Sequence, residues 1–368
     1  MRPVVVDIGV VVDSGRQLAD VLRLVVVPVF AWAAYRDVRT RRVPGQVWYP
    51  LVALGAVLLA VETAAAAGAP TTRRRFLVQA GLSLGFVVPL AYLFWRVAGF
   101  GGADAKAVMV LALLFPTSPT YLTTAGPQSL GVPGSLPVAE TPVGVFAFTA
   151  LTNAVVAGAV YPLVLVAVNT ARGDVSSIMF LGRPVAVERL PERYGRLLER
   201  SDGSVGRGLD LDALRMYLRW RGRSLGALRD DPERLRDPAT LPETPNDPGD
   251  GVVTDGSRSR DSVAVDESSV DPADSAATGA PSEAPEERGE ETAEDDPWGA
   301  AAFLDDIEGT AYGTSAVDLR DGLNLLVSAD RVWISPGLPF MIPLFLGLVV
   351  GLTYGDVFFD LLSLVGVV

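Results

Sequence analysis

Long apolar segments constrain this chain more than any other feature of its sequence. A helix needs about 20 mostly apolar residues to cross the hydrocarbon core of a bilayer. The sequence therefore predicts a mainly α-helical, polytopic membrane protein with about six transmembrane helices and a lipid bilayer around it. The six apolar segments that carry this prediction are residues 17–36, 47–67, 76–97, 105–123, 142–169 and 336–355.

Two of these segments contain features that a lipid-facing helix would not tolerate. The first has Asp20 and Arg23 near its start, and the fourth runs into Pro116 and Pro119. No water inside the bilayer can satisfy a charged side chain or a carbonyl group that proline leaves without a donor. We therefore expect both segments to be buried among neighbouring helices that supply the missing partners.

The charge of the chain divides it into two unlike parts. The net charge is -12, yet residues 230–296 alone hold 21 acidic residues and only 5 arginines. The region is also rich in Pro, Gly and Ser and nearly free of aromatic residues, so it cannot bury enough apolar surface to offset its chain entropy. It is predicted to form a disordered acidic insert over residues 230–300.

The segments on either side of this region regain an apolar pattern, which predicts a small cytoplasmic domain that the insert interrupts. The predicted organisation is transmembrane helices one to five in residues 1–170, the small domain in 171–229, the insert in 230–300, a return of the domain in 301–335, and a final transmembrane helix with a C-terminal tail in 336–368.

Arginine placement predicts the orientation of the helices in the membrane. Cytoplasmic loops of membrane proteins carry an excess of Lys and Arg. Arginines crowd residues 36–42 and residues 171–229, so both loops are predicted to be cytoplasmic. Arg73, Arg74 and Arg75 conflict with this scheme, because six crossings place them on the outer side.

The chain contains no cysteine and no histidine. Disulfides, thiol nucleophiles, histidine bases and Cys/His zinc sites are thereby excluded, and carboxylates are the chief remaining catalytic side chains. We expect no metal site, no cofactor and no nucleic-acid partner.

Two aspartates stand where apolar segments meet short polar loops, and both ends lie on the predicted cytoplasmic side. Asp37 precedes an Arg-rich turn, and Asp104 follows the glycines Gly101 and Gly102. Two carboxyl groups at close range share one proton, so one can act as a base on water and the other as an acid. Capping of a helix, or pairing with a nearby arginine, is the structural alternative for each residue.

Three motifs in this order resemble the archaeal prepilin and preflagellin (prearchaellin) peptidases, which belong to the type IV prepilin peptidases among the GxGD intramembrane aspartyl proteases. The motifs are the Asp37 segment, the turn Gly101-Gly102-Ala103-Asp104-x-Lys106, and the proline-rich stretch 334–343. The resemblance covers about residues 17–229 and 300–355. It implies Asp37 and Asp104 as catalytic residues. It also implies supporting roles for Gly101, Gly102, Lys106, Pro336 and Pro339.

Two departures from the family pattern carry information. Ala103 replaces the second glycine of GxGD, which indicates a backbone outside the left-handed region at this position. Bacterial relatives that also methylate the new amino terminus hold zinc in a cysteine cluster, and this chain has no cysteine. We therefore expect no N-methyltransferase activity.

The resemblance implies a multi-pass membrane endopeptidase that removes class III signal peptides from prepilin and prearchaellin precursors, its partners, at the cytoplasmic membrane face. Two hypotheses of other classes stay open. One is a transporter or ion-conducting protein that uses Asp37 and Asp104 to move protons or cations. The other is a non-catalytic membrane scaffold, for which both aspartates would be dispensable.

Overall fold

The computed structural model of the chain describes residues 17–68, 70–97, 100–122, 135–139, 141, 143–253, 296–307, 311–337 and 339–366. The chain forms two compact units, and each is described by itself. The first unit comprises Met1–Val160 with Leu338–Val368, and the second comprises Tyr161–Gly337. The fold is mainly helical, as predicted, and the strands are short.

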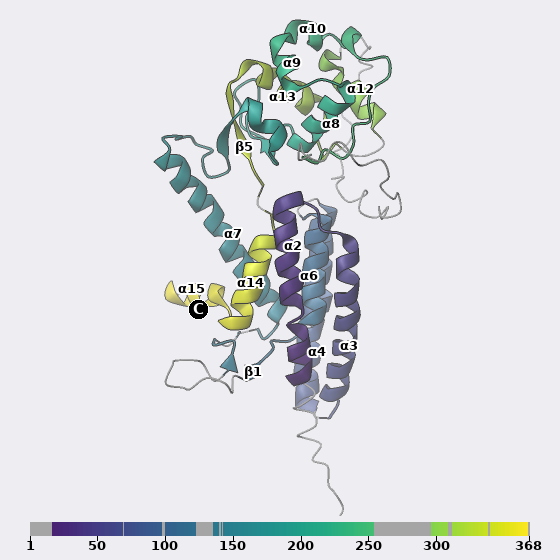
Figure 1. The fold of residues 1–368 in the computed structure, drawn as a ribbon. Coiled ribbons are helices and arrows are strands. Elements are labelled where there is room, and N and C mark those ends of the chain that lie inside the picture. Colours follow the sequence, from purple (N-terminus) through teal and green to yellow (C-terminus); the bar gives the residue numbers. More distant parts are fainter. Residues whose placement is uncertain are drawn as a thin grey trace, which may run out of the picture. The chain divides into compact units, whose positions relative to one another are not determined.

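The first unit is a helical bundle in which α2, α3, α4 and α6 stand side by side (Figure 1). Residues 17–23 are helical and lead into α2, and the long helix α7 passes from the first unit into the second. The elements of the first unit are α2 (Val26–Thr40), η1 (Gly45–Val47), α3 (Trp48–Ala66), α4 (Pro70–Leu82), the π-helical turn η2 (Ser83–Val87), α5 (Val88–Arg96), α6 (Gly102–Leu114), β1 (Tyr121–Leu122), β2 (Ser135–Leu136), α7 (Phe146–Ala171), α14 (Met341–Thr353) and α15 (Val357–Leu364).

Four helices in the described part of the chain are long and apolar enough to cross a membrane, or five if a bent pair counts as one span. The bent pair is α14 and α15, which meet at an angle of 79°. The predicted fourth segment differs most from the structure, because α6 ends at Leu114 and its 13 residues are only about 20 Å long. The helices that meet the criteria are Gln17–Thr40, Gly45–Ala66, Pro70–Arg96 and Phe146–Ala171.

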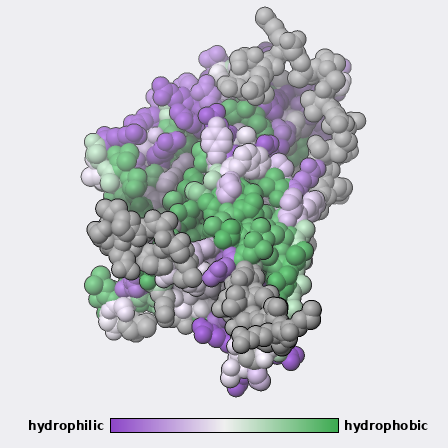
Figure 2. Space-filling model, turned by 60° about the horizontal axis from the view of Figure 1, so that its bottom comes forward, coloured by the Kyte–Doolittle hydropathy of each residue, from purple (hydrophilic) through white to green (hydrophobic). Residues whose placement is uncertain are grey.

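Apolar side chains cover much of the outside of these helices. Val57 on α3, Leu77 on α4 and Val155 on α7 are each more than half exposed. Figure 2 shows hydrophobic residues gathered over a broad surface. A surface of this kind is unfavourable in water but suits contact with lipid chains, so it agrees with the predicted bilayer.

The early end of α6 has a physical cause in Pro116. The carbonyl oxygen of Ala112 would normally accept from the N–H four residues later, which Pro116 lacks. The buried hydroxyl of Ser83 donates to this oxygen instead, at 2.8 Å. The carbonyl oxygen of Leu114, the last residue of α6, accepts from Nε of Arg23 at 2.6 Å. The expectation that this segment needs partners on neighbouring helices is therefore confirmed.

Arg23 is fully buried and links three segments of the bundle. Its guanidinium forms ion pairs with Asp20 at 2.5 Å and with Glu62 of α3 at 2.7 Å. It also lies over the ring of Phe115, 5.7 Å from the ring centre. A charge this deep is tolerated only where such partners surround it.

The second unit combines short helices with a three-stranded antiparallel sheet of order β3-β5-β4. Val185 pairs with Val332, and Leu197 pairs with Ile334. Its elements are β3 (Arg183–Ala186), η4 (Val187–Glu192), β4 (Arg196–Leu197), α8 (Leu211–Arg221), α9 (Leu225–Asp230), α10 (Pro232–Arg236), η5 (Pro238–Thr240), η7 (Pro297–Gly299), α12 (Ala300–Asp306), α13 (Ala316–Ser328) and β5 (Arg331–Ser335).

Both ends of the predicted acidic insert belong to the core of the second unit, so the expectation of disorder over residues 230–300 is wrong for 230–253 and 296–300. Leu235 and Trp298 are buried in this core. Gly299 approaches Leu241 so closely that a Cβ on it would lie 2.5 Å from that side chain. Residues 254–295, the rest of the predicted insert, lie outside the described residues.

Candidate active site

Asp37 lies in the last turn of α2, and two backbone groups fix its surroundings. Arg41 ends the helix in the left-handed conformation, and its N–H donates to the carbonyl oxygen of Asp37 at 2.9 Å. The half-buried Asp37 carboxylate accepts a hydrogen bond from the backbone N–H of Met341, the first residue of α14. The positive end of one helix therefore faces the aspartate at the end of another.

Asp104 lies in the first turn of α6, which begins after the cap residue Gly101. Its carboxylate accepts from the backbone N–H of Gly101, the arrangement of an acidic side chain that caps its own helix. A Cβ on Gly101 would lie 3.1 Å from Oδ2 of Asp104. Glycine at this position therefore leaves room for the carboxylate to fold back over the helix start.

The backbone of this turn is unstrained. Gly101 has a φ of -65°, which any residue can adopt. Gly102 and Ala103 are the first two residues of the helix. The expectation that Ala103 avoids the left-handed region is confirmed, and Gly99 lies outside the described residues.

The two aspartates come together at one end of the bundle. The charge of Asp37 acts on the Asp104 carboxyl, and the charge of Arg41 acts on both. The opposite end of α6 is marked by Leu114, which binds Arg23. Within the described ranges no group of three acidic side chains is placed to hold a metal ion. The site therefore offers two carboxyl groups, one guanidinium and two backbone donors.

Aromatic stacking holds the start of α14 against the Gly-rich turn. The ring of Phe340, the residue before α14, lies 4.9 Å from that of Phe100, which itself stacks on Phe94 at 5.1 Å. Further along α14, Gly347 packs directly on the α7 backbone, where a Cβ would come within 2.3 Å of the carbonyl oxygen of Ala150. These two contacts, together with the packing of α14 on α2, help to fix where the Met341 N–H lies.

The remaining predicted site residues are placed as follows. Lys106 lies two residues after Asp104, and its Nζ is 3.3 Å from where a Cβ on Gly45 would lie. Pro339 accepts from Ile342 in the turn that begins α14. Pro336 follows β5 and belongs to the second unit. The last helix, α14, begins at Met341, five residues after the start of the predicted segment 336–355.

Sequence reasoning missed three parts of the site. Arg41 entered the prediction only as one of the nearby arginines that orient the chain or pair with an aspartate, and no sequence pattern shows that its charge acts on both carboxyls. The Phe100–Phe340 stack joins residues that are far apart in the sequence, and no pattern announces it. The Met341 donor is a backbone group, so no residue type reveals it.

Comparison with protein families identifies two matching regions. Residues 24–163, which include both aspartates, match the type IV leader peptidase family. Residues 311–357, which include the start of α14, match the archaeal peptidase A24 C-terminus type II family. No curated protein and no solved structure matches the chain. The two family matches agree with the aspartate pair at the end of the bundle, and the chain belongs to the type IV leader peptidase family, whose members are aspartic-type prepilin peptidases.

Proposed function

We propose that this enzyme removes class III signal peptides from archaeal prepilins and prearchaellins at the cytoplasmic membrane face, with Asp37 and Asp104 as its catalytic pair. The observation that carries the proposal is the placement of these two carboxyls at one end of the bundle, where the charge of Asp37 acts on the Asp104 carboxyl. The archaeal C-terminal family match supports precursors of archaeal pili and archaella as the substrate class.

The proposed chemistry needs only water and the two carboxyl groups. When two carboxyls share one proton, the ionised one takes a proton from water and the protonated one gives its proton to the carbonyl oxygen or the leaving amine. Water adds to the scissile carbonyl carbon, and the C–N bond then breaks. The N–H groups of Met341 and Gly101 orient the two carboxyls for this exchange. The proton belongs to the pair rather than to either residue.

The position of the pair suits a substrate that is itself a membrane helix. A precursor whose apolar helix lies in the bilayer presents its cleavage site near the headgroups, which is the depth at which α2 ends and α6 begins. We place this end of the bundle, and the second unit, on the cytoplasmic side because arginines crowd residues 36–42 and 171–229. Lys106 and Pro339, together with Pro336 of the second unit, are proposed to support substrate binding.

Substitution of each aspartate tests the proposal. A prepilin or prearchaellin precursor is co-expressed with the wild type, Asp37→Asn or Asp104→Asn, and its size is followed on a gel. Asn keeps the shape of the side chain but cannot exchange a proton, so we expect each variant to process the precursor at least about 100-fold more slowly. Asp360→Asn is the matched control, because Asp360 is exposed and accepts only from Tyr354 among the contacts described.

Processing at the wild-type rate by both single variants would overturn the catalytic pair. That outcome would favour the scaffold hypothesis, which makes both residues dispensable. The transporter hypothesis predicts instead that purified protein in vesicles carries a proton or cation flux that either substitution abolishes. A pH-sensitive dye inside the vesicles measures that flux.

A further inference from the structure

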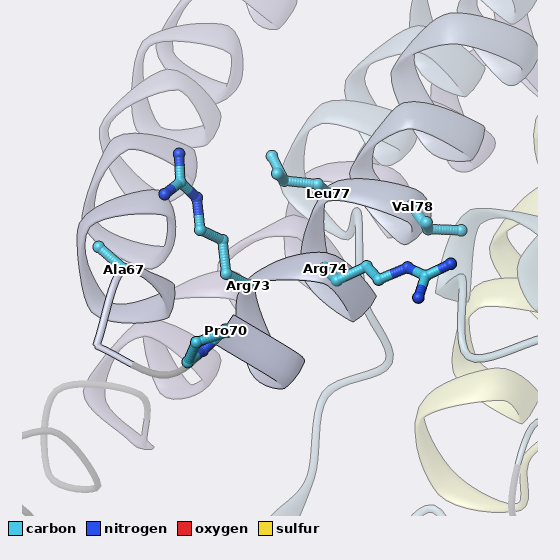
Figure 3. Close-up of a pocket in the computed structure, with 6 residues that line it drawn as sticks. All are labelled: Ala67, Pro70, Arg73, Arg74, Leu77 and Val78. Atoms are coloured by element: carbon cyan, nitrogen blue, oxygen red, sulfur yellow. The ribbon is translucent and has the colours of Figure 1, made fainter.

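The three consecutive arginines 73–75 are not used by the proposed chemistry. They lie in the first turns of α4, at the end of the bundle away from the aspartates. Two of them, Arg73 and Arg74, line a pocket of about 420 Å³ at the turn between α3 and α4. Figure 3 shows the two side chains extending in different directions from α4, Arg73 above Pro70 toward the helix that ends at Ala67, and Arg74 to the other side, below Val78.

The pocket is positively charged and its charge is not neutralised by the neighbouring protein. Its lining contains no acidic side chain. Within the part of the chain that the structure describes, neither Arg73 nor Arg74 forms an ion pair. Glu62 on the adjacent α3 is committed to the buried Arg23, 2.7 Å away. An anion in the pocket would therefore meet a guanidinium group that no carboxylate of the described residues neutralises.

The rest of the lining is apolar and continues into the surface that faces lipid. Leu77 and Val78 are 51% and 55% exposed, and Phe86 lies further along the same span with 51% exposed. The pocket thus combines two cations at the end of a membrane-spanning helix with an apolar path toward the bilayer core. Phosphate is a strong partner for arginine, and basic pockets between transmembrane helices favour anionic headgroups.

We propose that this pocket binds an anionic membrane lipid, whose phosphate pairs with one of the two diverging guanidinium groups of Arg73 and Arg74 while the other adds to the positive potential, and whose chain lies along Leu77 and Val78. A volume of about 420 Å³ accommodates a headgroup, while the chain continues over the exposed apolar surface. The bound lipid neutralises the arginines that conflict with the predicted orientation of the chain. The inference is independent of the peptidase chemistry, because the pocket lies at the other end of the bundle.

Native mass spectrometry of the full-length protein in detergent tests the proposal. The protein is titrated with dioleoylphosphatidylglycerol, which is anionic, or with dioleoylphosphatidylcholine, which carries no net charge. We expect one retained phosphatidylglycerol per chain and no comparable retention of phosphatidylcholine. Arg73→Gln/Arg74→Gln should weaken this binding about thirtyfold. Each arginine near an anionic lipid surface contributes about 1 kcal/mol, and the loss of two corresponds to that factor.

The matched control is Arg96→Gln/Arg172→Gln, which removes the same charge from two exposed arginines elsewhere. It should leave the retained lipid unchanged. Equal retention of the two lipids, an unaffected pocket variant, or equal loss in the control variant would each overturn the proposal. Competition by inorganic phosphate as effectively as by the lipid would show a soluble-anion site instead, and would also overturn it.

A measurement on the wild type covers the case in which the pocket variant does not fold. Salt should release phosphatidylglycerol from the wild type, because the contact with arginine is ionic and partly exposed. Retention that salt does not change would contradict a guanidinium–phosphate contact.

Discussion

Gly347 offers a test of how helix packing positions the proposed chemistry. This residue of α14 lies against the α7 backbone, where a Cβ would be 2.3 Å from the carbonyl oxygen of Ala150 and 2.6 Å from the nitrogen of Ala154. A carbon atom normally stays about 3.3 Å or more from a carbonyl oxygen. Gly347→Ala therefore forces α14 away from α7 by about 1 Å, because a backbone carbonyl cannot rotate out of the way.

The displacement should reach the site. Gly347 lies six residues after Met341, or about 9 Å along the helix, so a rigid helix carries the shift to the N–H that binds Asp37. A misplacement of about 1 Å costs about 100-fold in rate. The effect on stability should be smaller, because overpacking costs about 1–3 kcal/mol while Ala in place of Gly returns about 1 kcal/mol of helix propensity.

Gly81→Ala in α4 is the matched control, because no described heavy atom lies within 4 Å of the Cβ it would add. The processing rate of a precursor in isolated membranes and the Tm in detergent are measured for both variants. We expect Gly347→Ala to lose most of its processing with a small decrease in Tm, and Gly81→Ala to retain both. If Gly347→Ala processes the precursor within about threefold of the control, α14 does not position the pair in the way we describe.

Two further predictions concern the second unit. Removing residues 255–294 should leave precursor processing intact. Removing 230–296 should prevent folding, because this larger deletion takes the buried Leu235 from the core and leaves Arg221 without its partners Leu235 and Thr240. Equal processing by the two deletion variants would contradict the prediction. Burial raises the pKa of Asp210 to about 6, against 3.8 in an unfolded chain, although Arg196 and Arg215 oppose the shift. The folded state then holds a proton that the unfolded state has lost, so the free energy of unfolding should fall by up to about 3 kcal/mol as pH rises from about 4 to about 6. Hydrogen exchange of the α8 amides in the wild type and in Asp210→Asn isolates the contribution of Asp210 to the free energy of unfolding. A contribution that rises between about pH 4 and about pH 6 would refute the prediction.

The sequence predicts the apolar helices well and their ends poorly. Pro116 signals that a helix cannot continue, but no local pattern shows that Ser83 and Arg23 would satisfy the carbonyls that it leaves open. The same limit applies to the last helix, which breaks between Thr353 and Val357. Both ends are decided by partners that lie far away in the sequence, so a window of about 20 residues cannot find them.

Composition misled the prediction of the insert for a related reason. An average over residues 230–300 is acidic and poor in aromatics, yet it conceals Leu235, Leu241 and Trp298, which pack into the second unit. Buried Arg221 supports this packing through the carbonyl of Leu235 and the hydroxyl of Thr240. A few apolar residues that pack into the core of an adjoining folded unit are enough to order a segment whose mean composition indicates disorder.

The sequence indicates the two aspartates as candidates, but it does not show how their carboxylates are held. Each carboxylate accepts from a backbone N–H at the start of a helix, Asp37 from Met341 of α14 and Asp104 from the cap residue Gly101 of α6. Helix starts place partial positive charge beside each carboxyl and fix its direction without a dedicated side chain. Only proline at either position would remove such a donor. The Phe100–Phe340 stack and the contact of Gly347 with α7 help to hold the start of α14 in place, so we expect them to act on the proposed chemistry as well.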